Sequence, residues 1–392
     1  MSARWVMPVA GCFLAVLLTG YELAAYAAAL PRLVGGTDVR LSDASAGVVA
    51  SGAMAGMLVG GLGSARLSRR HPSSTVLRAA VATMVAGMAA CTVATQPWAL
   101  GVGRLLTGVG AGAAVPSAIA LTAAVAPRRR RTAVHTLMFS GLQLGSALGA
   151  LAAPVILHGG GWRPLFGVGA GAAACLVLVL PRLTRDGGGR AGAGDLVGVR
   201  ALWTPATRRL TVTHWASTAM SLLVVYGLNA WLVQLLLDAG HGPTDSLRLL
   251  AVFNLGAVLG TPLAGLAADR WGQPGTAFAL FAGGAVGLAV LATDPASRAA
   301  SVLLWLAGLG TMGATTILNG ATATAYGADL RATGLGWALG IGRLGAAAGP
   351  LAGGLLLGAG ATPGALLLAF AAAALATAGL VASSPARPAS PT

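Results

Sequence analysis

The stretch GLGSARLSRR at residues 61–70 has a counterpart in GLAADRWG at residues 265–272, which begins 204 positions further along the 392-residue chain. Each stretch begins with glycine, and each brings arginine to the end of a long apolar run. Both follow the second of a series of such runs. Two copies of one pattern at equivalent places indicate that the chain consists of two similar halves, so this repeat decides how the fold is organised.

The composition places the chain in a lipid bilayer. Hydrophobic residues make up 56% of it and charged residues 9%, whereas soluble domains have about 25% charged residues. Windows of about 20 apolar residues, enough to cross a bilayer, occur twelve times, six on each side of a polar segment. These windows lie near residues 7–30, 45–65, 74–95, 98–125, 133–157, 162–181, 210–237, 247–268, 275–293, 299–325, 333–359 and 362–383. We predict an all-α integral membrane protein with twelve transmembrane helices in two six-helix pseudo-symmetric bundles.

The same windows define the expected domains. We predict an N-terminal six-helix bundle over residues 1–181, a cytoplasmic linker over 182–209 and a C-terminal six-helix bundle over 210–392. Within the linker, residues 196–203 are expected to form a short interfacial helix. Parallel repeats of six helices are typical of secondary transporters, whose substrate site lies near the membrane midplane between the halves. The repeat therefore predicts a transporter.

Orientation follows from the arginines, which are the only basic residues besides histidine. With a cytoplasmic N-terminus, 18 of the 25 arginines fall in cytoplasmic segments and five outside, while Arg104 and Arg343 remain within spans. Positive charge accumulates on the cytoplasmic side of membrane proteins. We therefore expect a multi-pass protein of the cell (inner) membrane with both termini cytoplasmic. The run at 128–131 is interpreted as a topology anchor and not as a nucleic-acid site, which would need aromatic platforms on a folded basic face.

Other chemistries find little support in the sequence. Cys12, Cys91 and Cys175 lie in apolar spans without metal-ligand spacing, so we expect no metal site and no cofactor. The glycines of residues 108–112 resemble a dinucleotide loop only in spacing, because that loop requires a preceding strand. We also find no set of residues suited to nucleophilic or metal-assisted catalysis that would lie together at one depth in the membrane. The sequence thus disfavours an enzyme or a receptor.

Glu22, the only glutamate, lies inside the first apolar window. An acid at this depth costs roughly 2.5–3.5 kcal/mol on insertion scales for comparable charges, and it usually faces a bundle interior or a cavity. At 1.5 Å per residue, Arg104 of the fourth window lies at a similar depth, so an ion pair is possible. We predict that Glu22 carries the coupling proton and that Arg104 tunes it. A static structural pair is the alternative.

Arg343 lies near the middle of the eleventh window. Arginine stays charged and offers a planar fork that matches a carboxylate, so we predict that Arg343 binds the anionic group of the substrate. Pairing with backbone carbonyls is the alternative. Further polar or aromatic candidates for the substrate site, each of which could equally form an interhelical hydrogen bond or an interfacial anchor, are Tyr21, Gln143, Tyr226, Asn229, Trp231, Asn254, Asn319 and Trp337. His135 and His214 lie near span ends, where interfacial placement is favoured over proton relay.

The repeated stretches resemble the G-x-x-x-D-R-x-G-R-R signature of the major facilitator superfamily. The resemblance implies the major facilitator fold and a gate that charge pairing locks on the cytoplasmic side. The residues that match this gating loop are Gly61, Arg66, Arg69, Arg70, Gly265, Asp269 and Arg270. The first copy has Ala65 where the aspartate belongs, which implies a weaker gate in the first half.

Longer stretches resemble one group of that superfamily, the aromatic acid:proton symporters. They are RLLTGVGAG at 104–112, GWRPLF at 161–166 and, most specifically, RATGLGWALGIGRLG at 331–345 followed by Gly349-Pro350. The resemblance covers all twelve spans. It implies proton-coupled uptake of a small aromatic organic acid by a protein that we expect to be a monomer.

The chain departs from this group in its first span. The group carries D-G-x-D there, whereas residues 19–22 read TGYE, so Thr19 replaces the first acid and Glu22 the second. The leading alternative is an exporter of a drug-like compound or secondary metabolite by proton antiport. Such exporters carry a G-x-x-x-G-P-x-x-G-G motif in span 5, and residues 141–149 lack its Gly-Pro step, which disfavours export.

Overall fold

The computed structural model describes residues 5–36, 38–127, 131–159, 161–184, 199–205, 207–293, 299–326 and 330–383. Twelve helices in this part of the chain are long and apolar enough to cross a membrane, as the sequence predicts. They are α1 (Val6–Gly35), α2 (Asp43–Leu67), α3 (Ser73–Val93), α4 (Pro97–Val125), α5 (Arg131–Ile156), α6 (Arg163–Leu183), α7 (Arg208–Asp238), α8 (Pro243–Trp271), α9 (Gln273–Thr293), α10 (Ala300–Ala325), α11 (Arg331–Gly358) and α12 (Pro363–Ala382). The described residues contain no strand.

Local sequence fixes where several helices begin and end. The hydroxyls of Ser42 and Thr362 accept hydrogen bonds from the backbone N–H groups three residues later, at the starts of α2 and α12, which is the usual role of an N-cap. Proline stands in the first turn of α4 and α8, where its missing N–H costs nothing. Gly272 ends α8 with a φ of 79°, a conformation that glycine adopts without strain.

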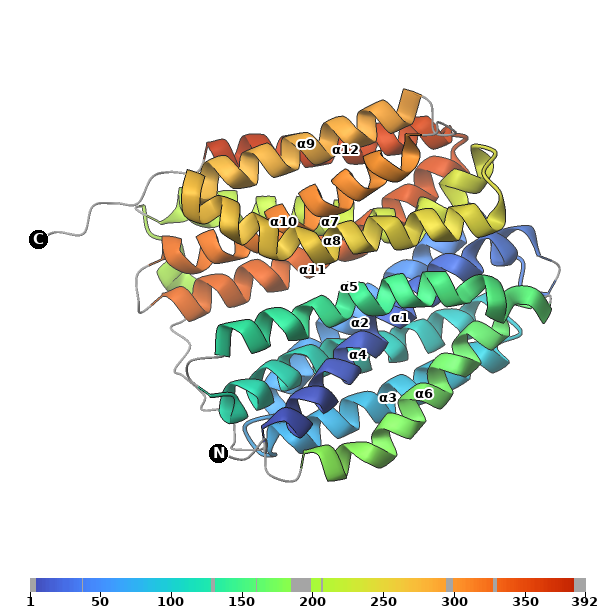
Figure 1. The fold of residues 1–392 in the computed structure, drawn as a ribbon, viewed down its shortest axis with the longest axis horizontal. Helices are drawn as coiled ribbons and strands as arrows, with labels where there is room; N and C mark the ends of the chain where they lie inside the picture. Colours follow the sequence, from blue (N-terminus) through green and yellow to red (C-terminus); the bar gives the residue numbers. More distant parts are fainter. Residues whose placement is uncertain are drawn as a thin grey trace, which may run out of the picture.

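The helices form two bundles with equivalent packing. In Figure 1, α1–α6 make up the lower bundle and α7–α12 the upper one. The pairs α1·α5, α2·α4 and α3·α6 of the first bundle correspond to α7·α11, α8·α10 and α9·α12 of the second. This correspondence confirms the pseudo-symmetric arrangement of two six-helix bundles.

Glycine allows the helices within each bundle to approach closely. A Cβ atom on Gly20 of α1 would collide with the carbonyl oxygen of Leu142 on α5, and one on Gly345 of α11 would collide with the carbonyl oxygen of Ala219 on α7. These are the equivalent helix pairs of the two bundles. Small residues at helix interfaces are the usual means of close packing in membranes.

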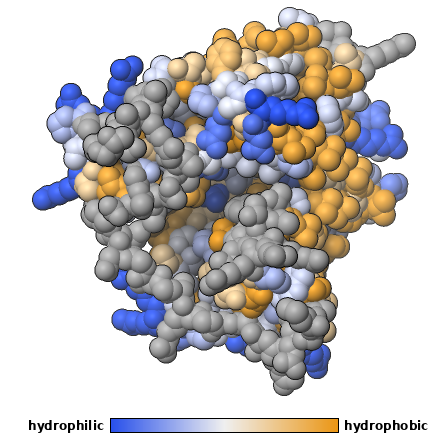
Figure 2. Space-filling model, turned by 60° about the vertical axis from the view of Figure 1, so that its left-hand side comes forward, coloured by the Kyte–Doolittle hydropathy of each residue, from blue (hydrophilic) through white to orange (hydrophobic). Residues whose placement is uncertain are grey.

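The two bundles meet unevenly along their length. We call the end at which α1 begins and α12 ends the terminal side and the opposite end the far side (Figure 1). On the far side, α2 packs against α11: the Ser51 hydroxyl donates to the Ala347 carbonyl oxygen over 2.7 Å, and a Cβ on Gly47 would lie 2.8 Å from the Pro350 carbonyl oxygen. Toward the terminal side, Gly336 and Gly340 of the same helix have no atom within 4 Å of an added Cβ. Figure 2 shows a hollow between the bundles on this side.

Part of the linker lies against the C-terminal bundle. Val199–Leu202 forms a short 3-10 helix, so four of the five positions that the structure describes within 196–203 are helical, where a short helix is expected. Leu202 is fully buried with Leu210 and Tyr326, and its carbonyl oxygen accepts hydrogen bonds from the hydroxyls of Thr207 and Thr211. These contacts hold the segment against the first turn of α7.

Candidate substrate and proton site

Glu22 and Arg104 form an ion pair inside the N-terminal bundle. Glu22 lies on α1 and Arg104 on α4, and their exposed fractions are 0% and 2%. Removing one partner of such a buried pair leaves an uncompensated charge. The ion pair that the matching depths allow is thus present, while its part in coupling remains a prediction.

Tyr26 completes this charged cluster. The guanidinium carbon of Arg104 lies 4.5 Å from the centre of the Tyr26 ring, within the range of a cation–π contact. The Tyr26 hydroxyl donates to the carbonyl oxygen of Ala46 on α2 over 2.6 Å. The cluster therefore joins α1, α2 and α4. Sequence reasoning missed Tyr26, although its position four residues after Glu22 places both on one face of α1.

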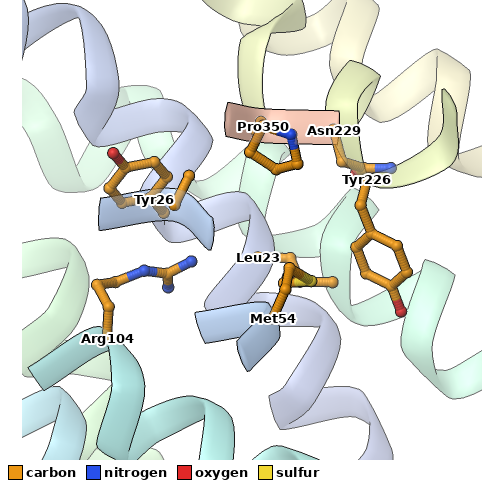
Figure 3. Close-up of a pocket in the computed structure, with 9 residues that line it drawn as sticks. Leu23, Tyr26, Met54, Arg104, Tyr226, Asn229 and Pro350 are labelled. Atoms are coloured by element: carbon orange, nitrogen blue, oxygen red, sulfur yellow. The ribbon is translucent and has the colours of Figure 1, made fainter. Parts of the chain in front are cut away.

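The ion pair retains unused hydrogen-bonding capacity. Glu22 Oε2 and Arg104 Nε are buried and have no hydrogen-bond partner among the described residues. Arg104 also lines a small cavity between the two bundles (Figure 3). The other lining residues come from α1, α2, α7 and α11 and are Leu23, Tyr26, Ala50, Met54, Tyr226, Asn229, Ala230 and Pro350. Its volume of about 10 Å³ has room for about one water molecule.

A second cavity adjoins the first and is larger, at about 30 Å³. The two share Leu23, Tyr226 and Asn229 as walls. Gln143 contributes its amide to the second cavity, and Ser146, also on α5, donates a hydrogen bond of 3.4 Å to Asn229 Oδ1. The predicted residues Gln143, Tyr226 and Asn229 are therefore brought together at the boundary between the bundles.

Arg343 of α11 reaches the same place through Tyr226. Its Nη1 donates to the Tyr226 hydroxyl over 3.3 Å and lies 3.8 Å from Met57 Sδ on α2. Arg343 is partly exposed, and no carboxylate of the described residues lies within ion-pair distance of it. Its charge is thus not neutralised by any carboxylate of the described residues.

Two other predicted residues point elsewhere. The Tyr21 hydroxyl donates to the carbonyl oxygen of Leu165 on α6 over 2.8 Å, inside the N-terminal bundle. Trp231 is fully buried, and its Nε1 donates to the Pro350 carbonyl oxygen over 2.9 Å. Neither side chain lines either cavity. For both, the structure has the interhelical hydrogen bond that the sequence left open as the alternative.

The remaining predicted residues also lie apart from the cavities. Asn254 donates to the Leu250 carbonyl oxygen of its own helix, and the side-chain oxygens of Asn254 and Asn319 are buried without a hydrogen-bond partner in the described chain. Trp337 is 44% exposed and stacks on Trp215 with ring centres 5.9 Å apart. This placement fits an interfacial anchor.

The gate residues lie at the ends of α2 and α8 and in the turn that follows α2. Gly61 and Arg66 belong to α2, which continues to Leu67, whereas Arg69 and Arg70 lie in the turn after it. The second copy, including Gly265, forms the last turns of α8. The charged members are exposed, and none makes an ion pair within the described residues; they are Arg66, Arg69, Arg70, Asp269 and Arg270. Arginines 128–130 lie outside the described residues, as does the side chain of His135.

His214 corrects one expectation from the sequence. Its depth near the end of a span favoured the membrane interface, but its side chain is buried, with 5% exposed, and its Nδ1 lies 2.7 Å from the Thr322 hydroxyl on α10. The expectation failed because depth along a helix does not determine which face of the helix a residue occupies.

Two similar bundles of membrane helices, closed on one side around a buried ion pair and small central cavities, define a multi-pass secondary transporter. The model of the Major Facilitator Superfamily matches residues 12–247, which is more than half of the chain. The chain therefore belongs to the major facilitator superfamily, as the repeated stretches predict.

Relatives and solved structures agree with this family. The chain is 34% identical over 357 residues to a gentisate transporter of Corynebacterium glutamicum, covering 87% of this chain and 79% of the relative. It is 32% identical to a 3-(3-hydroxy-phenyl)propionate transporter of Escherichia coli, with 92% and 89% covered. Among solved structures, a bacterial homologue of the human lysosomal transporter Spinster superposes with a TM-score of 0.79 at 16% identity, covering 97% of this chain and 95% of that one. That structural likeness shows the fold.

Proposed function

We propose that the protein takes up a small aromatic acid together with protons by alternating access. It acts as a monomer in the cell membrane, with the terminal side in the cytoplasm. The single observation that carries the proposal is the position of Arg343, which contacts Tyr226 at the cavities next to the Glu22–Arg104 pair. Its guanidinium is partly exposed and has no carboxylate partner among the described residues. Two relatives that match most of the chain are named for aromatic acids, which supports the substrate class.

Arg343 and Tyr226 bind the carboxylate of the substrate in this account. Guanidinium offers two parallel donors to a carboxylate, and the Tyr226 hydroxyl adds a donor beside it. The apolar walls of the cavities, among them Leu23, Met54 and Met312, suit the ring of an aromatic acid. Because the present cavities hold only about a water molecule or two, substrate binding requires the bundles to move.

Glu22 couples the proton to the substrate through Arg104. When Glu22 binds a proton, its charge is neutralised and Arg104 becomes an unpaired cation on the cavity wall, which attracts an anion. When the proton leaves, the ion pair forms again and the anion loses its partner. Opposite charges at this distance in a buried site interact strongly, so the protonated and substrate-bound states favour each other.

Thr19 restricts this coupling to one carboxylate in α1. It is fully buried, and its hydroxyl donates to the Ala15 carbonyl oxygen of its own helix. The position where the symporters have their first acid therefore offers no proton-binding group here. We propose a single coupling proton at Glu22 for this span.

Arg66, Arg69, Arg70, Asp269 and Arg270 form the gate on the terminal side. They carry charge at the end of α2, in the turn after it and at the end of α8, and they are exposed while the far side is packed. In the opposite state of the transporter, Asp269 approaches basic residues and closes the terminal side. Gly61 and Gly265 let the ends of α2 and α8 come close.

Purified protein in liposomes with an imposed pH gradient tests the function. A panel of radiolabelled aromatic acids, including gentisate and benzoate, is supplied outside at low pH. Accumulation above the equilibrium level, abolished by a protonophore, is the expected result. Extrusion of dyes against a gradient without accumulation of any acid would favour the exporter and contradict the proposal.

A further inference from the structure

A ladder of polar side chains runs between α7 and α10 inside the C-terminal bundle. Near the terminal side, the Tyr326 hydroxyl donates to Thr211 over 3.0 Å. Next, His214 Nδ1 contacts the Thr322 hydroxyl over 2.7 Å. Further in, the Ser221 hydroxyl bonds that of Thr315. These three contacts are the rungs of the ladder, and each joins one side chain of α7 to one on or next to α10.

The register of the ladder indicates a fourth rung. Seven residues along α7 from His214 to Ser221 correspond to seven residues back along α10 from Thr322 to Thr315. Moving three residues from His214 to Ser217 therefore corresponds to moving three back from Thr322 to Asn319. Residues three, four and seven apart share one face of a helix, so Ser217 and Asn319 lie on the same polar faces as the rungs.

This level lacks a direct hydrogen bond. Ser217 Oγ and Asn319 Oδ1 are both buried, and neither has a partner among the described residues. Buried polar atoms are rarely left unsatisfied, and internal water commonly satisfies them. Ser217 Oγ and Asn319 Oδ1 lie between the His214–Thr322 and Ser221–Thr315 rungs. One water molecule that bridges them would satisfy both atoms.

The ladder ends close to the central cavities. Leu222, Val225 and Met312, within about one turn of the Ser221–Thr315 rung, line the second cavity together with Tyr226. In the other direction, the ladder reaches Leu202 of the linker, whose carbonyl oxygen accepts from Thr211 over 3.0 Å. It thus extends from the substrate region to the terminal side.

His214 is the one histidine of this ladder. Its Nδ1 lies 2.7 Å from the Thr322 hydroxyl, which itself donates to the Leu318 carbonyl oxygen over 2.7 Å. Histidine is the side chain whose charge changes most readily near neutral pH.

Several ionisable side chains of the described residues lie around α7. Tyr326, one rung away, belongs to the ladder, and Arg208 and Arg209 are exposed at the start of α7. Arg343 of α11 contacts Tyr226, and Glu22 of α1 is paired with Arg104. The charged residues of α8 lie in its first two and last two turns; α12 and the interior of α10 contain no ionisable residue.

We propose that His214 and the ladder between α7 and α10 form a proton path through the C-terminal bundle. A water between Ser217 and Asn319 takes the proton that Glu22 releases toward the central cavity and passes it to His214, which in turn releases it past Thr211 and Tyr326 toward the terminal side. The path rests on the proposed function, since it supplies the exit for the proton of that symport.

Two transport assays on the same liposomes test the path. Exchange of labelled for unlabelled acid needs no net proton release, whereas substrate-induced proton uptake does. In His214→Asn, the amide can keep the bond to Thr322 but cannot titrate. We expect His214→Asn to slow proton uptake by about tenfold or more while exchange stays within about twofold of wild type. Ser217→Ala should give the same pattern more weakly, because a buried water needs its polar partners.

The exposed His158, on the far side, provides the matched control. His158→Asn should leave both assays unchanged. Proton uptake at the wild-type rate in His214→Asn would overturn the path. An equal loss of exchange and proton uptake in both His214→Asn and Ser217→Ala would also overturn it, because that result shows a general transport defect.

A readout without substrate separates this path from the proposed function. Deuterium exchange at the imidazole C2 of each histidine, followed by mass spectrometry, reports contact with water. We expect His214 to exchange despite its burial and Ser217→Ala to slow it severalfold. If no aromatic acid is transported but His214 exchanges in this way, the proposed function fails and the path stands. If acids are transported but His214 does not exchange, the path fails alone.

Discussion

Arg343 of α11 and Tyr226 of α7 share a hydrogen bond of 3.3 Å beside the central cavities. Tyr226 lines both cavities, so the bond connects a partly exposed cation to the space between the bundles. In the proposed transport cycle, an anion that enters from the terminal side meets this pair before it reaches Arg104. We therefore propose that Arg343 binds the substrate directly.

Arg343→Lys should weaken binding of aromatic acids by roughly tenfold or more, because lysine cannot replace a bidentate guanidinium contact. The matched ligand is the corresponding amide, whose weak binding should not change. Isothermal titration with purified protein measures both. Equal losses for acid and amide would contradict a role in recognising the carboxylate. Tyr226→Phe, which removes one donor but keeps the ring, should cause a smaller loss for the acid.

Removal of Arg104 alone should destabilise the protein. In Arg104→Met the carboxyl of Glu22 stays buried without its partner, which costs about 3–5 kcal/mol for a broken buried pair. The double variant Glu22→Gln/Arg104→Met should recover much of this loss, since well-packed neutral residues can replace a buried pair. Thermal unfolding in detergent measures both. A double variant no more stable than Arg104→Met would contradict the account of the pair.

Gly47 should control closure of the far side. A valine there meets the Pro350 carbonyl oxygen and the Gly354 Cα, 2.8 Å and 3.1 Å from the added Cβ, so Gly47→Val should shift the protein toward the state that is open on the far side. Spin labels on α2 and α11 at the far side should move apart in pulsed electron resonance. Gly336→Val is the control, because an added Cβ there has nothing within 4 Å. If the distances between the spin labels are the same in Gly47→Val as in Gly336→Val, Gly47 does not have this role.

The sequence predicts the twelve helices well because each apolar run is long enough to cross a bilayer and ends in charged or turn-forming residues. The similar depths of Glu22 and Arg104 in their spans were also sufficient to predict that the two residues form an ion pair. Depth does not show which face of a helix points inward, since lipid-facing and interior faces are both apolar. Tyr21 and Tyr26 illustrate this limit: both lie near Glu22 in sequence, yet only Tyr26 lines the cavity.

The same limit explains why the sequence did not predict the orientation of Trp231 and His214. Trp231 lies only two residues after Asn229, but its ring packs against α11 and its Nε1 reaches Pro350. His214 lies near the end of its span and yet faces α10. Each of these placements depends on contacts with a helix that is distant in sequence, which no local pattern encodes.

The most direct test of proton coupling through Glu22 is substrate-induced proton uptake by Glu22→Gln liposomes, measured beside exchange of labelled acid in the same preparation. Glutamine keeps the size and polarity of the side chain but cannot carry a proton. We expect exchange to persist while proton uptake and accumulation against a gradient are lost. Accumulation driven by a pH gradient at the wild-type level in Glu22→Gln would contradict the account.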